Sequence, residues 1–97
     1  MNDKRDMYVE KFKAKIYEWN AEIDRLNARA KQTEADTRMA YLDQVRELEK
    51  QRDETREKIN RLQEAGEGAW EDLKAGTEMT FEAMRVTFES IRERFKF

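Results

Sequence analysis

The stretch VEKFKAKIYEWNAEIDRL, residues 9–26, decides the fold class. Its apolar side chains recur at alternating spacings of three and four residues, from Val9 through Phe12 and Ile16 to Leu26. That spacing places them on one face of an α-helix and is typical of the seam of a coiled coil. Because the intervening side chains are mostly charged or polar, the segment is predicted to be an amphipathic helix that buries a single stripe.

The same pattern continues along the chain from residue 26 to residue 64. The seam passes through Thr33 and Thr37, steps by four residues at a time, and resumes a heptad at Val45 in a shifted frame. A stutter of this kind moves the seam without ending the helix. Because no Gly, Pro or Asn in residues 31–37 supplies a turn, we predict one continuous helix over about residues 4–64.

The segment AGEG, residues 65–68, is the one convincing break. Gly66 suits the left-handed residue just past a helix end, and Gly68 frees the chain to reverse. A second helix is predicted over about residues 69–96. Gly76 is a candidate for a kink within it, with Thr77 capping the remainder. All of this forms a single helical domain spanning residues 1–97.

The second helix is too short to cover the first. At a rise of about 1.5 Å per residue it spans about 42 Å against about 90 Å for the first helix. After folding back it covers only residues 38–64, and the apolar strip of the front half is left bare. Such a strip favours an antiparallel dimer that crosses near Thr33 to Thr37, with a three-helix bundle at each end.

A monomeric up-down three-helix bundle is the alternative, with the chain reversing near Gln32 and Thr33. The two architectures differ by a domain swap at this one hinge. We favour the dimer because the hinge lacks turn residues. The predicted self-association seam consists of Phe12, Ile16, Trp19, Ile23, Leu26, Val45, Leu48, Ile59, Leu62, Trp70, Leu73, Phe81, Met84, Phe88, Ile91 and Phe95, and a second apolar surface on the last helix consists of Met79, Val86 and Phe97.

The amino-acid composition argues against most kinds of catalytic and metal-binding site. The 97 residues include no Cys and no His, which removes thiol nucleophiles, the commonest general base and the commonest metal ligands. Ser90 is the only serine, and no His exists to activate it. We therefore predict no catalytic site, no metal and no cofactor. A net charge of −2 lacks the basic footprint of nucleic-acid binding, so no nucleic-acid partner is expected.

The first residues, Met1 to Asp6, carry charges of both signs and are followed by no apolar run. We therefore expect neither a signal peptide nor a membrane span, and a cytoplasmic location.

Two segments carry a resemblance to a known group. The chain resembles small bacterial coiled-coil-domain proteins of unassigned function, through EWNAEID at residues 18–24 and AWEDLKAG at residues 69–76, which leads into an aromatic amphipathic tail. The resemblance covers nearly the whole length and implies a helical fold and a stress or envelope connection. It brings no catalytic residues.

Two functions remain open after these exclusions. We prefer a non-catalytic, self-associating coiled-coil protein, with a homodimer favoured, that interacts with a protein partner the residues do not name. The alternative is a peripheral protein that binds a membrane or granule surface through its amphipathic C-terminal helix.

Overall fold

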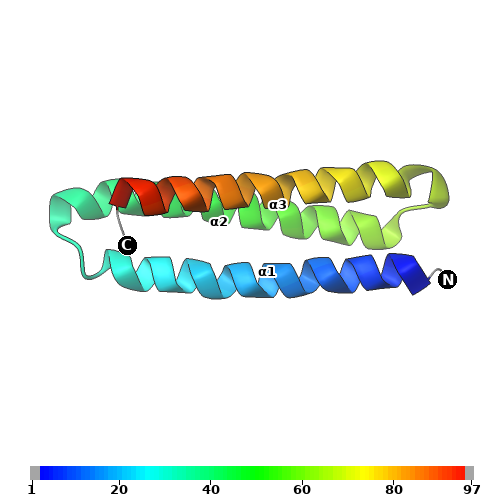
Figure 1. Ribbon diagram of the computed structural model, residues 1–97, viewed down its shortest axis with the longest axis horizontal. Coiled ribbons are helices and arrows are strands. Elements are labelled where there is room, and N and C mark those ends of the chain that lie inside the picture. Colours follow the sequence, from blue (N-terminus) through cyan, green and yellow to red (C-terminus); the bar gives the residue numbers. More distant parts are fainter. Residues whose placement is uncertain (1–2, 96–97) are drawn as a thin grey trace.

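The computed structural model describes residues 3–95 as three long helices that run up, down and up again: α1 (Asp3–Ala30), α2 (Ala35–Glu64) and α3 (Glu67–Phe95). They form a narrow bundle of 52 × 18 × 17 Å (Figure 1). The predicted all-α class and the predicted amphipathic helices are confirmed. Of the two predicted architectures, the three-helix bundle within one chain is the one observed.

The apolar stripes of all three helices meet in one continuous core. Phe12, Ile23 and Leu26 on α1 are buried, so the front half of the chain is covered by α2 and α3 of the same molecule. The strip expected to lie bare is therefore sheltered. The reason is that α1 and α2 are separate antiparallel helices of similar length. The side chains of α1 therefore pack against α2 and α3, whereas in the predicted continuous helix no segment of the same chain lies beside residues 4–30.

The prediction of one continuous helix over residues 4–64 is wrong at residues 31–34, where the chain reverses. No glycine or proline makes this turn. Its first part is closed by Thr33, whose backbone N–H and side-chain hydroxyl both donate to the carbonyl oxygen of Ala30, at 3.2 and 2.7 Å. A hydroxyl thus satisfies a carbonyl that the helix end would leave without a partner.

Arg38, in the first turn of α2, completes the reversal. Its Nε donates to the carbonyl oxygen of Ala30 at 3.1 Å, and its Nη2 donates to those of Thr33 at 2.8 Å and Lys31 at 3.4 Å. Glu34, the residue before α2, provides no side-chain cap. The turn is therefore stabilised by a long side chain that reaches backwards, a device that turn-residue statistics do not detect.

The connection between α2 and α3 is shorter than predicted, because α3 begins at Glu67 and includes Gly68 in its first turn. Ala65 is extended, with φ −68° and ψ 139°, and its N–H donates to the carbonyl of Leu62. Gly66 does not adopt the left-handed conformation expected of it. An extended residue after the helix end reverses the chain here instead of a left-handed one.

Helix α3 continues without interruption through Gly76. Thr77 is buried inside the helix, and its hydroxyl donates to the carbonyl of Leu73 at 2.8 Å. The predicted N-cap is therefore wrong, and Thr77 is a mid-helix threonine whose hydroxyl bonds back one turn. Thr55 on α2 does the same toward the carbonyl of Gln51 at 2.7 Å, which is how two polar side chains enter the core.

Helix α2 lies centrally, and α1 and α3 flank it as parallel neighbours (Figure 1). No Cα atom of α1 comes within 8 Å of a Cα atom of α3 within the described helices. Aromatic side chains fill the distance between them. The ring centroids of Phe12 and Phe81 are 5.5 Å apart, and those of Trp19 and Phe88 are also 5.5 Å apart. The backbone of α1 is thus close to α2 alone.

Candidate interaction surfaces

The residues of the predicted seam all belong to the intramolecular core. Their role in contacts between molecules stays a prediction. The predicted seam omitted Tyr8, which packs against the core from outside the heptad frame, and Tyr41, which is buried, whereas Val9, which the heptad spacing places on the seam, is buried as that spacing predicts. The buried members are Phe12, Ile16, Ile23, Leu26, Val45, Leu48, Ile59, Leu62, Trp70, Phe81, Met84 and Ile91, and the partly buried members are Trp19, Leu73, Phe88 and Phe95.

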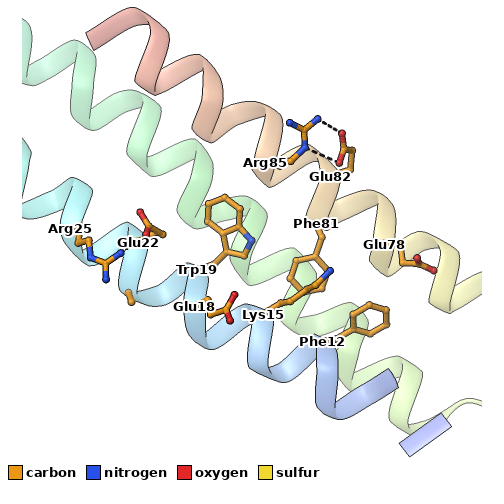
Figure 2. A pocket seen from close by; sticks show the side chains of 11 residues that line it. Phe12, Lys15, Glu18, Trp19, Glu22, Arg25, Glu78, Phe81, Glu82 and Arg85 are labelled. Atoms are coloured by element: carbon orange, nitrogen blue, oxygen red, sulfur yellow. Dashed lines mark hydrogen bonds and ion pairs between the residues drawn. The ribbon is translucent and has the colours of Figure 1, made fainter. Parts of the chain in front are cut away.

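A groove of about 580 Å³ follows the space between α1 and α3. Figure 2 shows Trp19 of α1 and Phe81 of α3 pointing into this space from opposite sides. Lys15 holds its ammonium group 5.5 Å from the centre of the Phe81 ring. The remaining lining is largely charged and comprises Phe12, Glu18, Ala21, Glu22, Arg25, Glu78, Glu82 and Arg85.

The carboxylates of this groove are partly neutralised on their own helices. Glu22 pairs with Arg25, and Glu82 accepts hydrogen bonds from both Nε and Nη2 of Arg85 (Figure 2). The hydrogen bonds from Arg85 lower the pKa of Glu82, and the same contact raises the pKa of Arg85. These contacts favour the ionised carboxylate of Glu82.

A cluster of aromatic rings and cations joins the start of α1 to Ala65 and to the first turns of α3. The ammonium group of Lys74 lies 4.1 Å from the ring centre of Tyr8, and a hydrogen bond with Tyr8 raises the pKa of Lys74. Arg5 lies over the Trp70 ring at 5.3 Å and donates to the carbonyl of Ala65. Trp70 Nε1 is buried without a hydrogen-bond partner among the described residues. These contacts fasten one end of α1.

Polar side chains also join α1 to α2 near the middle of the bundle. Asn20 accepts from Arg52 at 3.1 Å and from Arg56 at 3.5 Å. By contrast, the ion pairs between Asp43 and Arg46 and between Glu57 and Arg61 each join residues of one helix. Those pairs stabilise the individual helices. They make no contact between helices.

The second predicted surface lies on the outward side of α3. Met79 is 72% exposed and Val86 is 53% exposed, and a separation of seven residues places them on the same helix face. Phe97 lies outside the described residues. Met7, Tyr17 and Met39 are exposed elsewhere, so large apolar side chains are not confined to α3.

No family model, no curated protein and no solved structure matches this chain. None of the described helices is long and apolar enough to cross a membrane. Within residues 3–95, no group of three or more Asp and Glu side chains is arranged to hold a metal ion.

Proposed function

We propose that this protein is a non-catalytic helical interaction protein that self-associates by exchanging α1 between two copies. The observation that supports this proposal is the turn at residues 31–34, in which every residue is compatible with a helix. If the turn straightens, α1 and α2 become the continuous helix that the heptad pattern favours. The α1 of a second copy then packs where the chain's own α1 packed.

Exchange keeps the core contacts and changes only which chain supplies them. The stacked pair of Phe12 and Phe81 and the edge-to-face pair of Trp19 and Phe88 would each form between two molecules in place of one. Because the buried apolar area stays the same, the balance between monomer and dimer depends on the turn and on protein concentration.

Multi-angle light scattering at low micromolar and at millimolar concentration tests this function. We expect the mass to rise with concentration from 11.7 kDa toward twice that value. A protein that stays monomeric and helical at millimolar concentration would contradict the proposal.

An insertion separates exchange from other modes of dimerisation. Five residues, Gly-Ser-Gly-Asn-Gly, placed between Gln32 and Thr33 make chain reversal easy and should abolish the dimer. The same five residues placed between Ala65 and Gly66 serve as the matched control and should leave the dimer intact. A dimer that survives the first insertion is not formed by exchange of α1.

The exposure of Met79 and Val86 supports a second candidate function, binding to a lipid or granule surface through α3. Deleting α3 is not a usable test, because this helix supplies part of the core. Vesicle flotation of a Met79→Glu, Val86→Glu variant tests it, beside a Tyr17→Glu, Met39→Glu variant with the same charge change elsewhere. Binding lost only in the first variant supports this function, and no binding of the native protein to anionic or neutral vesicles rules it out.

A further inference from the structure

One arginine supplies most of the side-chain hydrogen bonds that hold the turn between α1 and α2. Arg38 donates three hydrogen bonds to carbonyl oxygens of the turn, those of Ala30, Lys31 and Thr33, while the residue preceding α2 gives no side-chain cap. Its side chain is half-buried against the turn. The remaining side-chain contribution is the hydroxyl of Thr33.

These bonds exist only while the chain is folded back. In a continuous helix the carbonyl of residue i accepts the N–H of residue i+4, so the carbonyls of Ala30 and Lys31 would be occupied by the N–H groups of Glu34 and Ala35. Arg38 would then extend from an ordinary helix face. The guanidinium therefore stabilises the reversed state and contributes little to the straightened one.

We propose that Arg38 is a latch that sets the balance between the closed monomer and a dimer of two copies that exchange α1. This inference rests on the proposed self-association and names the residue that controls it. The partner surface is the apolar face of α2 and α3 in a second copy of this chain, the face that α1 covers in the monomer. Because an exchanged dimer contains two straightened turns, the dimer forms only when two latches open.

The proposed role of Arg38 predicts how far Arg38→Ala shifts the equilibrium between monomer and dimer. Charge-assisted hydrogen bonds are stronger than neutral ones, so loss of this cap should favour the straightened turn by roughly tenfold, and the dimer, with two turns, by about a hundredfold. Residue 38 is helical in both states, so the higher helix propensity of alanine does not itself shift the balance between them. Arg38→Lys keeps the charge and loses the planar fork of donors, and should shift the equilibrium by less.

The dimer dissociation constant, measured by sedimentation equilibrium on the full chain, tests the latch. Arg46→Ala is the matched control, because it removes an exposed arginine of the same helix whose ion pair is with Asp43, one turn away. Circular dichroism on each variant verifies that helix content is retained. We expect the constant to fall strongly for Arg38→Ala, less for Arg38→Lys, and to stay unchanged for Arg46→Ala.

The outcomes separate the latch from the underlying self-association. Equal dimerisation of the native protein and Arg38→Ala overturns the latch and leaves self-association standing. Monomers at every concentration for both proteins overturn both ideas. A tighter Arg38→Ala dimer that disappears on insertion of Gly-Ser-Gly-Asn-Gly between Gln32 and Thr33 supports both, and one that persists with the insertion overturns the latch.

Discussion

Single side chains carry the contact between α1 and α3, because the backbones of these helices stay apart. Phe12 and Phe81 stack, Trp19 meets Phe88 edge to face, and Tyr8 meets the Trp70 ring at 5.7 Å. Large rings bridge a distance that aliphatic side chains leave open. The contact between α1 and α3 therefore depends on individual aromatic residues, whereas α1 packs against α2 through its apolar stripe.

We expect Trp19→Ala and Phe88→Ala to lower the free energy of unfolding by about 2 kcal/mol each, because each partly buried ring loses its contact with the other ring and its apolar area against the core. Because the two rings touch, the double variant should cost about 1 kcal/mol less than the sum of the single variants. Urea unfolding monitored by circular dichroism measures all four corners of this cycle. Strict additivity would show that the two rings do not interact in solution.

Tyr41 makes the stability of the bundle sensitive to alkaline pH. Burial raises the pKa of its phenol above the ordinary value of 10.0, with the nearby Arg29 opposing this effect. A folded-state pKa above the unfolded one means that the stabilisation is complete below pH 10.0 and is lost as pH rises through the folded-state pKa. Thermal unfolding across this range should show a steeper alkaline loss for the native chain than for Tyr41→Phe. Equal slopes would contradict the assignment.

At the scale of elements, all three helices are amphipathic, but the two connections between them are stabilised by different contacts. The α1–α2 turn is closed by Arg38 and Thr33, and the α2–α3 connection is closed by an extended Ala65. Inside α3, Gly76 occupies a position that needs no glycine: its backbone is helical, and nothing lies within 4 Å of the point where a Cβ atom would stand. Gly76 is thus a weak point in an otherwise regular helix.

Gly76→Ala should stabilise the protein by about 0.5–1 kcal/mol, because alanine loses less backbone entropy on folding into a helix. The midpoint of thermal unfolding reports the change. Gly68→Ala, in the first turn of the same helix, is the comparison and should give a smaller gain, because helix ends fray. A destabilised Gly76→Ala variant would mean that α3 bends at this residue.

At the scale of the whole molecule, shape distinguishes exchange from side-by-side association. The single-chain bundle is 52 Å long and 17–18 Å across. An exchanged dimer contains a continuous helix of about 90 Å at about 1.5 Å per residue, so it should be much longer than the monomer without being thicker. Small-angle X-ray scattering of the dimer measures both dimensions. A dimer that is thicker and no longer than the monomer would exclude exchange.

The amino-acid pattern by itself determined that the chain is helical, which side chains face the core and where the last helix begins to within two residues. Those features depend on local spacing, because apolar residues three and four apart share a helix face whatever the helix packs against. The seam residues from Phe12 to Phe95 could therefore be identified from the sequence, and so could the exposure of Met79 and Val86 on the opposite face of α3.

Only the tertiary structure decided that the chain reverses at residues 31–34. The segment contains no turn residue, and its reversal depends on Arg38 reaching back across eight positions to the carbonyl of Ala30. That contact forms only when α1 and α2 are already antiparallel, so no local sequence pattern predicts it. The sequence pattern does not distinguish packing of α1 on its own chain from packing on a second copy, because the same buried stripe satisfies both, and the turn held by Arg38 is what differs between them.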